Sequence, residues 1–271
     1  MNPQARETLR ITASMAVACA LGAAVLGAVY AATERYQRAA ALRGERAAVT
    51  ELLALAPDVP VLEVRQELAP AAAAVVYRAA PLGGGSTARE FAFTLDGTPA
   101  AVPVPGTKRV PLGRLFVARR GGAPIGFVVE GTARGYKNRI RFLVALAPDG
   151  TIRGVRVVEH EEDPGLGAEV ATPLFQAQFD GRDSAAAARL DVTRDPMPED
   201  WRVALSDLRR IPARTWEARY GALARHERAH AVYAVTGATI SSRALTDGVR
   251  LTVDHFRRRW ALIAPRLGEA T

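Results

Sequence analysis

The chain has 271 residues, of which 49% are hydrophobic, and a formal net charge of +8 at pH 7. This length allows one globular domain with a real core and a smaller lobe or stalk. A basic balance indicates nucleic-acid binding only where the charges cluster, and the one tight run, Arg257–Arg259, lies on an expected helix between Phe256 and Trp260. We interpret that run as a solvated helix face, so no nucleic-acid partner is expected.

The single cysteine and the four histidines exclude several kinds of redox centre. Cys19 alone cannot build an internal disulfide, a thiolate-bound iron–sulfur cluster, a c-type haem or a blue-copper site. The histidines show no zinc spacing; they are His160, His226, His230 and His255. Any electron carrier in this chain is therefore expected to be organic, and neither a metal site nor a catalytic residue is predicted.

An uncharged segment from Ile11 to Ala32 predicts one transmembrane helix. At ~1.5 Å per residue it spans roughly 33 Å, enough for a bilayer core of about 30 Å. Residues 1–10 then form a short cytoplasmic N-terminus, and the main domain faces the periplasm or the cell exterior from the cell inner membrane. A cleavable signal peptide ending near residues 29–31 is the alternative. Arginines on both sides of the segment prevent the positive-inside rule from deciding the orientation.

Residues 33–87 are expected to form a helical stalk and a linker. Their first part is a polar-to-amphipathic helix that Pro57 and Pro60 stop. The apolar segment 71–80 is short for a membrane span. The Pro- and Gly-rich segment 81–86 predicts a flexible joint before the main domain.

Residues 88–271 are expected to form that domain, with an α+β fold in which helices pack a small antiparallel sheet. Alternating apolar residues at 91–95 and 126–130 indicate strands. The clearest hairpin joins segments 140–146 and 152–158 through a Pro-Asp-Gly turn.

A final helix is predicted from about Ser242 to Ala264. Its apolar residues recur every three or four positions and form one packed stripe, which consists of Leu245, Val249, Val253, Phe256, Trp260 and Ile263. Ser241 and Ser242 are expected as N-cap residues, and Pro265 is expected to end the helix.

The loop after the hairpin combines residue types that suit a flat ligand; its sequence is His160-Glu161-Glu162-Asp163-Pro164-Gly165-Leu166-Gly167. Proline fixes one backbone angle and the two glycines permit positive φ, so the loop can lie close against such a ligand. Three acidic residues and a histidine are placed to tune it. The alternative interpretation is a plain strand-to-helix turn.

A second segment carries four hydroxyl groups at the start of the final helix; its sequence is Thr236-Gly237-Ala238-Thr239-Ile240-Ser241-Ser242. Small residues there leave backbone N–H groups directed outward, where the helix dipole favours a phosphate. The alternative interpretation is an N-cap with more hydroxyls than it needs.

From about Gly126 to the C-terminus, the two segments together resemble the FMN-binding domain of the G subunit of the Rnf electron-transport complex and the C subunit of the sodium-pumping NADH:quinone reductase. In that family a loop H-x-E-T-P-G-L-G precedes D-x-x-[S/T]-G-A-T, whose final Thr bears FMN in phosphoester linkage. The residues that match are His160, Glu162, Pro164, Gly165, Leu166, Gly167, Thr236, Gly237, Ala238 and Thr239. The segment from Gly131 to Tyr136, with Gly150, is more similar to the Rnf subunit.

The resemblance implies an electron-carrying subunit of a membrane-bound, ion-translocating oxidoreductase of the Rnf type rather than an enzyme by itself, with FMN bound covalently to Thr239. It implies further cofactor contacts from Thr236, Gly237, Ala238, Ser241, Ser242, Glu162, Asp163, Pro164, Gly165, Leu166 and Gly167. The implied partners are other membrane subunits, the membrane, and a flavin transferase during maturation. A stand-alone membrane-tethered FMN protein and a structural subunit without flavin are the alternatives.

Two positions depart from the family pattern. Asp163 stands where the family has Thr, which is expected to alter a hydrogen bond to the flavin ring. Tyr233 stands where the motif has the Asp that helps define the site for the transferase, so slow or incomplete loading is expected. Covalent attachment itself suits a shallow site, because a helix N-terminus contributes only ~0.3–1 kcal/mol toward an anion, whereas micromolar retention needs about 8 kcal/mol.

Overall fold

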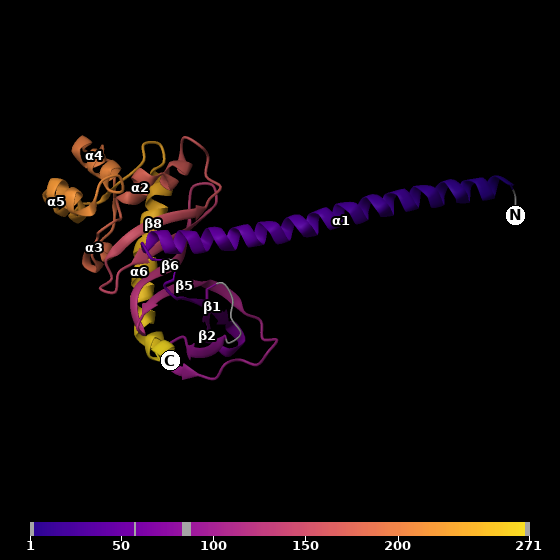
Figure 1. Ribbon diagram of the computed structural model, residues 1–271, viewed down its shortest axis with the longest axis horizontal. Coiled ribbons are helices and arrows are strands. Elements are labelled where there is room, and N and C mark those ends of the chain that lie inside the picture. Colours follow the sequence, from indigo (N-terminus) through magenta and orange to yellow (C-terminus); the bar gives the residue numbers. More distant parts are fainter. Residues whose placement is uncertain (1–2, 57, 83–87, 269–271) are drawn as a thin grey trace. The chain divides into compact units, whose positions relative to one another are not determined.

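The computed structural model describes residues 3–56, 58–82 and 88–268, so Pro57 and the joint predicted around residues 83–86 lie outside the described residues. Contacts divide the chain into two compact units, Met1–Ala47 and Ala48–Thr271. The first unit is the greater part of helix α1 (Pro3–Leu52), and the second contains the other described helices and strands (Figure 1).

The first unit is one continuous helix with an apolar middle. Among the described residues, only its segment Met15–Thr33 is long and apolar enough to cross a membrane, with 19 residues, a mean hydropathy of 2.0 and none of it buried. Large side chains such as Leu21 and Leu26 are more than half exposed there, and a lipid phase would remove that apolar surface from water. A signal sequence meets the same criteria, so the retained anchor stays a prediction.

The expected stalk and linker over residues 33–87 is helical only as far as Leu52, and this part of the domain prediction is corrected. Strands β1 (Val61–Ala69) and β2 (Ala74–Pro81) pair antiparallel within the main sheet, so the domain begins well before residue 88. The sequence did not predict β2 because most of its residues on both faces are buried, which removes the alternation that identifies a strand.

The main sheet of the described chain has eight strands in the order β4-β3-β2-β1-β5-β6-β7-β8, and all neighbours are antiparallel. Its remaining strands are β3 (Arg89–Thr94), β4 (Pro99–Ala100), β5 (Val110–Arg120), β6 (Ala123–Arg134), β7 (Arg139–Leu146) and β8 (Ile152–Glu159). The α+β prediction and the β7–β8 hairpin are confirmed, although the sheet is larger than expected. Gly150 has a φ of 88° in the hairpin turn, a conformation that glycine adopts without steric cost.

Helix α6 (Thr239–Gly268) packs lengthwise on one face of this sheet, against β6 and β7 (Figure 1). The predicted apolar stripe is buried apart from Trp260, which is partly buried. Each fully buried side chain of this kind stabilises the fold by about 1.5–3 kcal/mol. The helix continues past Pro265 to Gly268, contrary to the prediction, because Ile263 and Leu267 are buried and hold the last turn on the sheet.

The opposite face of the sheet has its own apolar cluster. Ala48, Val49, Leu52 and Leu53, from the end of α1 and the residue after it, pack there against side chains of β5, β6 and β7. The sheet is therefore covered by apolar contacts on both faces, which explains why its central strands are mostly buried.

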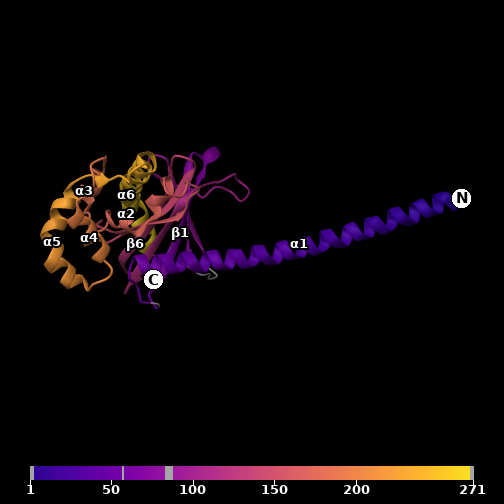
Figure 2. The ribbon, with the colours of Figure 1, turned by 90° about the horizontal axis from the view of Figure 1, so that it is seen from above.

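Between β8 and α6 the chain forms short elements, in the order η2 (Gly167–Ala171), α2 (Pro173–Ala177), α3 (Ser184–Ala188), β9 (Val192–Thr193), α4 (Glu199–Asp207), α5 (Ala213–Ala229) and β10 (Val232–Tyr233). Helices α4 and α5 pack around Trp201, Trp216 and Tyr220, and both lie on the side of α6 away from β1 (Figure 2). Strands β9 and β10 pair in parallel. This pairing positions the chain just before Thr236 and the start of α6.

Candidate functional site

The segment around Thr239 turns sharply and then begins helix α6. Gly237 has a φ of 80°, a left-handed conformation that favours glycine. The first helical hydrogen bond runs from the Ser242 N–H to the Ala238 carbonyl, at 2.9 Å. The N–H groups of the three residues before Ser242 therefore have no carbonyl acceptor within the helix. Thr239 is the first residue of the helix and is half-buried. This end of α6 therefore presents a partly accessible hydroxyl at an electropositive helix terminus.

Ser241 and Ser242, predicted as N-cap residues, are buried inside the first turn of the helix. The Ser242 Oγ accepts a hydrogen bond from the Val235 N–H at 3.1 Å and closes the turn before the helix. The Ser241 hydroxyl donates to the carboxylate of Glu162. The N-cap prediction is wrong because α6 begins earlier, at Thr239, which turns both serine side chains inward.

Glu162 lies at the centre of the other segment and is only 5% exposed. Its Oε1 accepts hydrogen bonds from the backbone N–H groups of Lys137 and Asn138, at 2.9 and 3.1 Å. Its Oε2 accepts from the backbone N–H of Tyr136, at 3.1 Å, and from the Ser241 hydroxyl. One carboxylate thereby joins the β6–β7 turn, the loop after β8 and the start of α6; we call this arrangement the Glu162 clamp.

The electrostatics of the Glu162 clamp favour the ionised carboxylate. Burial alone would raise the pKa of the Glu162 carboxyl, because a charged group loses hydration. The hydrogen bonds from the Ser241 hydroxyl and from the three backbone N–H groups outweigh that effect and lower the pKa. Glu162 therefore anchors the loop as an anion and is not placed to donate a proton at neutral pH.

Two glycines leave the space that this carboxylate occupies. A Cβ atom on Gly135 would overlap the Glu162 Oε1, and one on Gly167 would overlap the Glu162 Oε2 and the Ser241 Oγ. Gly165 differs, because open space surrounds it and its φ is 73°. The packing of the clamp therefore requires Gly135 and Gly167, whereas the backbone conformation of the loop tip requires Gly165.

The tip of the loop, from Asp163 to Leu166, faces solvent. The Asp163 carboxylate pairs with the Lys137 Nζ at 2.6 Å, and this hydrogen bond raises the pKa of the lysine. Leu166 is 48% exposed, and its Cδ2 lies 3.3 Å from the position that a Cβ on Gly237 would take. The two segments singled out in the sequence therefore meet at the Leu166 side chain.

Three exposed apolar side chains, Tyr136, Leu166 and Ile240, belong to the segments that the Glu162 clamp joins. Tyr136 follows β6, Leu166 lies in the loop after β8, and Ile240 is next to Thr239. Exposed apolar groups on segments that meet at a helix N-terminus suit a ligand with a planar apolar ring and an anionic group. FMN is such a ligand, so the residues present fit this cofactor.

Tyr233 lies in β10, just before the turn that leads to α6. Its hydroxyl donates to the Glu227 Oε2 at 2.8 Å. The Gln178 side chain accepts from its backbone N–H and donates to its carbonyl, at 2.8 and 3.1 Å. Burial, followed by the hydrogen bond to Glu227, raises the pKa of Tyr233 to about 12. A neutral phenol thus satisfies a buried carboxylate at the position where the family motif has an acid.

The other motif residues differ in how far they are exposed to solvent. Thr236 and Pro164 are exposed, and Ala238 is buried behind the turn. The His160 Nδ1 is buried and has no hydrogen-bond partner among the described residues. The donors at residues 136–138 could not be predicted from the sequence, because backbone N–H groups leave no side-chain signature; the glycine at position 135 was the one available signal of close packing.

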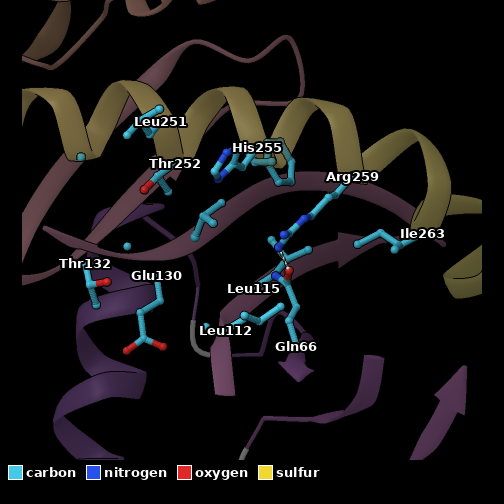
Figure 3. Close-up of a pocket in the computed structure, with 15 residues that line it drawn as sticks. Gln66, Leu112, Leu115, Glu130, Thr132, Leu251, Thr252, His255, Arg259 and Ile263 are labelled. Atoms are coloured by element: carbon cyan, nitrogen blue, oxygen red, sulfur yellow. Dashed lines mark hydrogen bonds between the residues drawn. The ribbon is translucent and has the colours of Figure 1, made fainter. Parts of the chain in front are cut away.

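A separate hollow lies further along α6 (Figure 3). Its volume is about 210 Å³, and its lining comes from β1, β5, β6 and α6 without any residue of the two segments. The Arg259 guanidinium donates to the Gln66 Oε1 at 2.7 Å, between α6 and β1. The site that the sequence motifs identify is therefore a surface where loops converge and is distinct from this cavity.

Comparison with known proteins connects the two segments to one family. Residues 135–254 match the family described as the FMN-binding domain, which confirms the resemblance inferred from the motifs. The matched range contains the whole Glu162 clamp, Tyr233 and the first half of α6.

Similar proteins carry names that agree with this match. The G subunit of the proton-translocating ferredoxin:NAD(+) oxidoreductase complex of Clostridium ljungdahlii is 32% identical over 139 residues, which cover 51% of this chain and 57% of the relative. The G subunit of the ion-translocating oxidoreductase complex of Cereibacter sphaeroides is 41% identical over 92 residues, 33% of this chain and 38% of the relative. The chain thus spans between 38% and 57% of the length of these relatives.

Among solved structures, the crystal structure of Shewanella oneidensis NqrC is similar with a TM-score of 0.41 and 23% identity, over 59% of this chain and 65% of that chain. The α+β fold of this chain is established by its own strand order and by the burial of its sheet.

Proposed function

We propose, because residues 135–254 match the FMN-binding domain family, that this chain is an electron-carrying subunit of a membrane-bound, ion-translocating oxidoreductase complex of the Rnf type. The observation that carries the proposal is that two separate motif segments meet in space, joined by the Glu162 clamp beside Thr239. The names of the relatives and the apolar segment of α1 support the membrane complex. When bound, the flavin supplies the redox chemistry.

Thr239 is the proposed attachment point, through a phosphoester on its hydroxyl. Ser241 and Ser242 are 1% and 0% exposed and already hydrogen-bonded, whereas Thr239 is half-buried. A phosphate on Thr239 would lie near the N–H groups of the first turn of α6 and the positive end of its dipole. Accessibility and electrostatics therefore both favour Thr239 over the two serines.

The loop tip from Asp163 to Gly167 is proposed to hold the flavin ring, with Leu166 as its apolar contact. In this arrangement Glu162 does not touch the ring; it fixes the loop from behind through the backbone of the β6–β7 turn. Leu166→Ala should shift the flavin midpoint potential or absorbance while the melting temperature stays close to that of the wild type. An unchanged spectrum and potential would return the tip to a plain turn.

The attachment is tested on protein produced together with a flavin transferase. A denaturing gel should show a fluorescent flavin band for the wild type, because a covalent bond survives unfolding. The band should disappear in Thr239→Val, whose side chain has the same shape but no hydroxyl.

Thr236→Val is the matched control, because Thr236 is an exposed threonine of the same segment, and its band should remain. Ser241→Ala should also remain fluorescent where the protein folds. Fluorescence in Thr239→Val would refute the attachment. A wild-type band without fluorescence but with flavin absorbance in the native state would indicate non-covalent binding, and no absorbance at all would favour the structural subunit.

Tyr233 is proposed to slow the loading of flavin. Its hydroxyl donates a hydrogen bond to the buried Glu227. The single variant Tyr233→Asp would therefore place two carboxylates together and destabilise the turn. We therefore expect the double variant Tyr233→Asp with Glu227→Gln to raise flavin occupancy, measured as the absorbance ratio of flavin to protein. Full occupancy of the wild type would show that Tyr233 does not limit loading.

The apolar segment Met15–Thr33 is the basis of the proposed membrane topology. The domain is placed on the periplasmic or outer side of the cell inner membrane, and protease added to spheroplasts should digest it. Protection until the membrane is broken would reverse the orientation.

Purification through a tag on this chain should bring down other membrane subunits; recovery of the chain alone would favour a stand-alone membrane-tethered flavoprotein.

A further inference from the structure

The end of α5 brings two histidines together, although no zinc site was predicted from their spacing. His226 and His230 are four residues apart in the sequence His226-Glu227-Arg228-Ala229-His230. Their Nε2 atoms lie 3.2 Å apart, and their ring centroids are separated by 4.5 Å. Both side chains are exposed, so an ion from solvent has access to the pair.

The separation of the two nitrogens fits one metal ion. With metal–nitrogen bonds of about 2.0–2.1 Å, two nitrogens 3.2 Å apart subtend an angle of roughly 100° at the metal. That angle suits two adjacent ligands of a tetrahedral or octahedral ion. Without a metal, the same separation of 3.2 Å is that of a hydrogen bond between the two rings.

The backbone of the pair is held in place from the protein interior. Arg182 is 2% exposed, and its Nη1 donates to the carbonyls of Arg228 and His230, each at 2.7 Å. The His230 N–H donates to the Glu227 carbonyl at 3.1 Å and ends the helix. A fixed backbone lowers the conformational entropy that the two imidazoles lose when they bind an ion.

The charged neighbours do not complete a larger site. Glu227 is buried and accepts from the Tyr233 hydroxyl, Arg225 pairs with Glu217, and Arg228 donates to a backbone carbonyl. No group of three or more His, Cys, Asp or Glu side chains in the described part of the chain could hold a metal ion. Because Glu227 is directed inward, it is not available as the general base of an H-E-x-x-H site, and no hydrolytic role follows from this spacing.

We propose that His226 and His230 chelate one divalent transition-metal ion, with water at its other positions. Imidazole nitrogen suits Zn²⁺, Ni²⁺ and Cu²⁺ better than Mg²⁺ or Ca²⁺. The two ligands come from the end of α5, outside the Glu162 clamp and the start of α6. The proposed metal site therefore shares no residue with the Glu162 clamp or with Thr239.

The test titrates the full-length chain, purified in detergent without a histidine tag and stripped with a chelator, with NiCl₂ in a calorimeter. We expect one site in the wild type and a loss of affinity of about tenfold or more in His226→Ala and in His230→Ala. His255→Ala is the matched control, since His255 is an exposed helical histidine outside the pair, and its affinity should equal that of the wild type.

A second measurement separates chelation from a change in folding. The Cu²⁺-loaded wild type should show nitrogen hyperfine coupling from two imidazoles in electron paramagnetic resonance, and each single variant should lose one nitrogen while its circular dichroism is unchanged. Wild-type affinity no higher than that of the double variant His226→Ala/His230→Ala would overturn the proposal. Equal nitrogen coupling in wild type and double variant would overturn it as well.

Discussion

Two buried carboxylates in this domain have opposite titration behaviour. The Glu162 carboxylate accepts hydrogen bonds from three backbone N–H groups and one hydroxyl, and these lower its pKa. Asp180 is 8% exposed; its Oδ2 lies 3.3 Å from the Arg209 guanidinium, and its Oδ1 has no hydrogen-bond partner among the described residues. Burial raises the pKa of Asp180 to about 7, although Arg209 and Arg228 oppose the shift.

The difference shows that burial by itself does not set the charge of a carboxyl group in this fold. Hydrogen-bond donors aimed at both oxygens keep Glu162 ionised, whereas an arginine at one oxygen does not compensate for the lost hydration of Asp180. The Glu162 carboxylate therefore acts as a fixed anchor for the motif loops. Asp180 instead takes up a proton near neutral pH.

The largest expected effect comes from removing the anchor. Glu162→Ala removes the acceptor of three partly buried backbone N–H groups and of the buried Ser241 hydroxyl, so the free energy of unfolding should fall by about 3 kcal/mol. Urea unfolding followed by circular dichroism measures it. Glu161→Ala, at the exposed neighbouring position, should change the free energy by less than about 0.5 kcal/mol; equal losses in the two variants would contradict the role assigned to Glu162.

The pH dependence tests the same anchor with less disturbance. The folded pKa of Glu162 lies below its ordinary value of 4.5, so its contribution to stability is present above pH 4.5 and is lost as the pH falls through the folded pKa. Glu162→Gln should therefore lose stability less steeply than the wild type as the solution becomes more acidic than that ordinary value. Parallel acid profiles would show that other carboxylates dominate there.

The glycine next to the anchor gives the next largest effect. Gly167→Ala would place a Cβ on the Glu162 carboxylate and the Ser241 hydroxyl, and overpacking of this kind costs about 1–3 kcal/mol. Gly165→Ala meets only the strain of a positive φ in open space. Unfolding in urea should show a larger loss for Gly167→Ala, and a larger loss for Gly165→Ala would mean that the backbone of the tip matters more than the packing behind it.

Asp180 should produce an effect of opposite sign. Between about pH 4 and pH 7 the folded state holds a proton that the unfolded state has released, so the wild-type free energy of unfolding falls as the pH rises through this range. Asp180→Asn removes that decline, so the variant should be more stable than the wild type at about pH 8, and the difference between the two proteins should shrink as the pH falls toward 4. A difference between the two proteins that does not change with pH would contradict the raised pKa.

The smallest effect is expected at the solvent-facing side of the clamp. Lys137 pairs with Asp163, and both side chains are about half exposed, so water and salt screen their attraction. Lys137→Ala should therefore leave the urea midpoint within experimental error at physiological salt, because the Lys137 backbone N–H to Glu162 remains. A clear drop of the midpoint would show that the side-chain pair, and not the backbone donors, holds the loop.

The amino-acid sequence by itself was enough to predict the elements whose hydrophobic residues recur with a regular spacing. The stripe on α6, the β7–β8 hairpin and the two motif segments were predicted from spacing and composition, because each depends on residues close together in the chain. The strands β1, β2 and β5 were not predicted, since their two-sided burial or bulged register hides the alternation. The helices α4 and α5 were missed as well, although their core residues Trp201, Trp216 and Tyr220 were present in the sequence.

Only the tertiary structure decided how the site is held together. Glu162 and Ser241, which the motifs predict as cofactor contacts, are buried and hold the loops in place through partners from three separate elements. The backbone beside the pair of His226 and His230 is likewise held by a distant residue. Arg182, which is 46 positions before Arg228 and 48 before His230, donates to the carbonyls of both. Residue types and spacing identify which groups can do chemistry, whereas burial and donors brought from distant segments determine which of them face the ligand and with what charge.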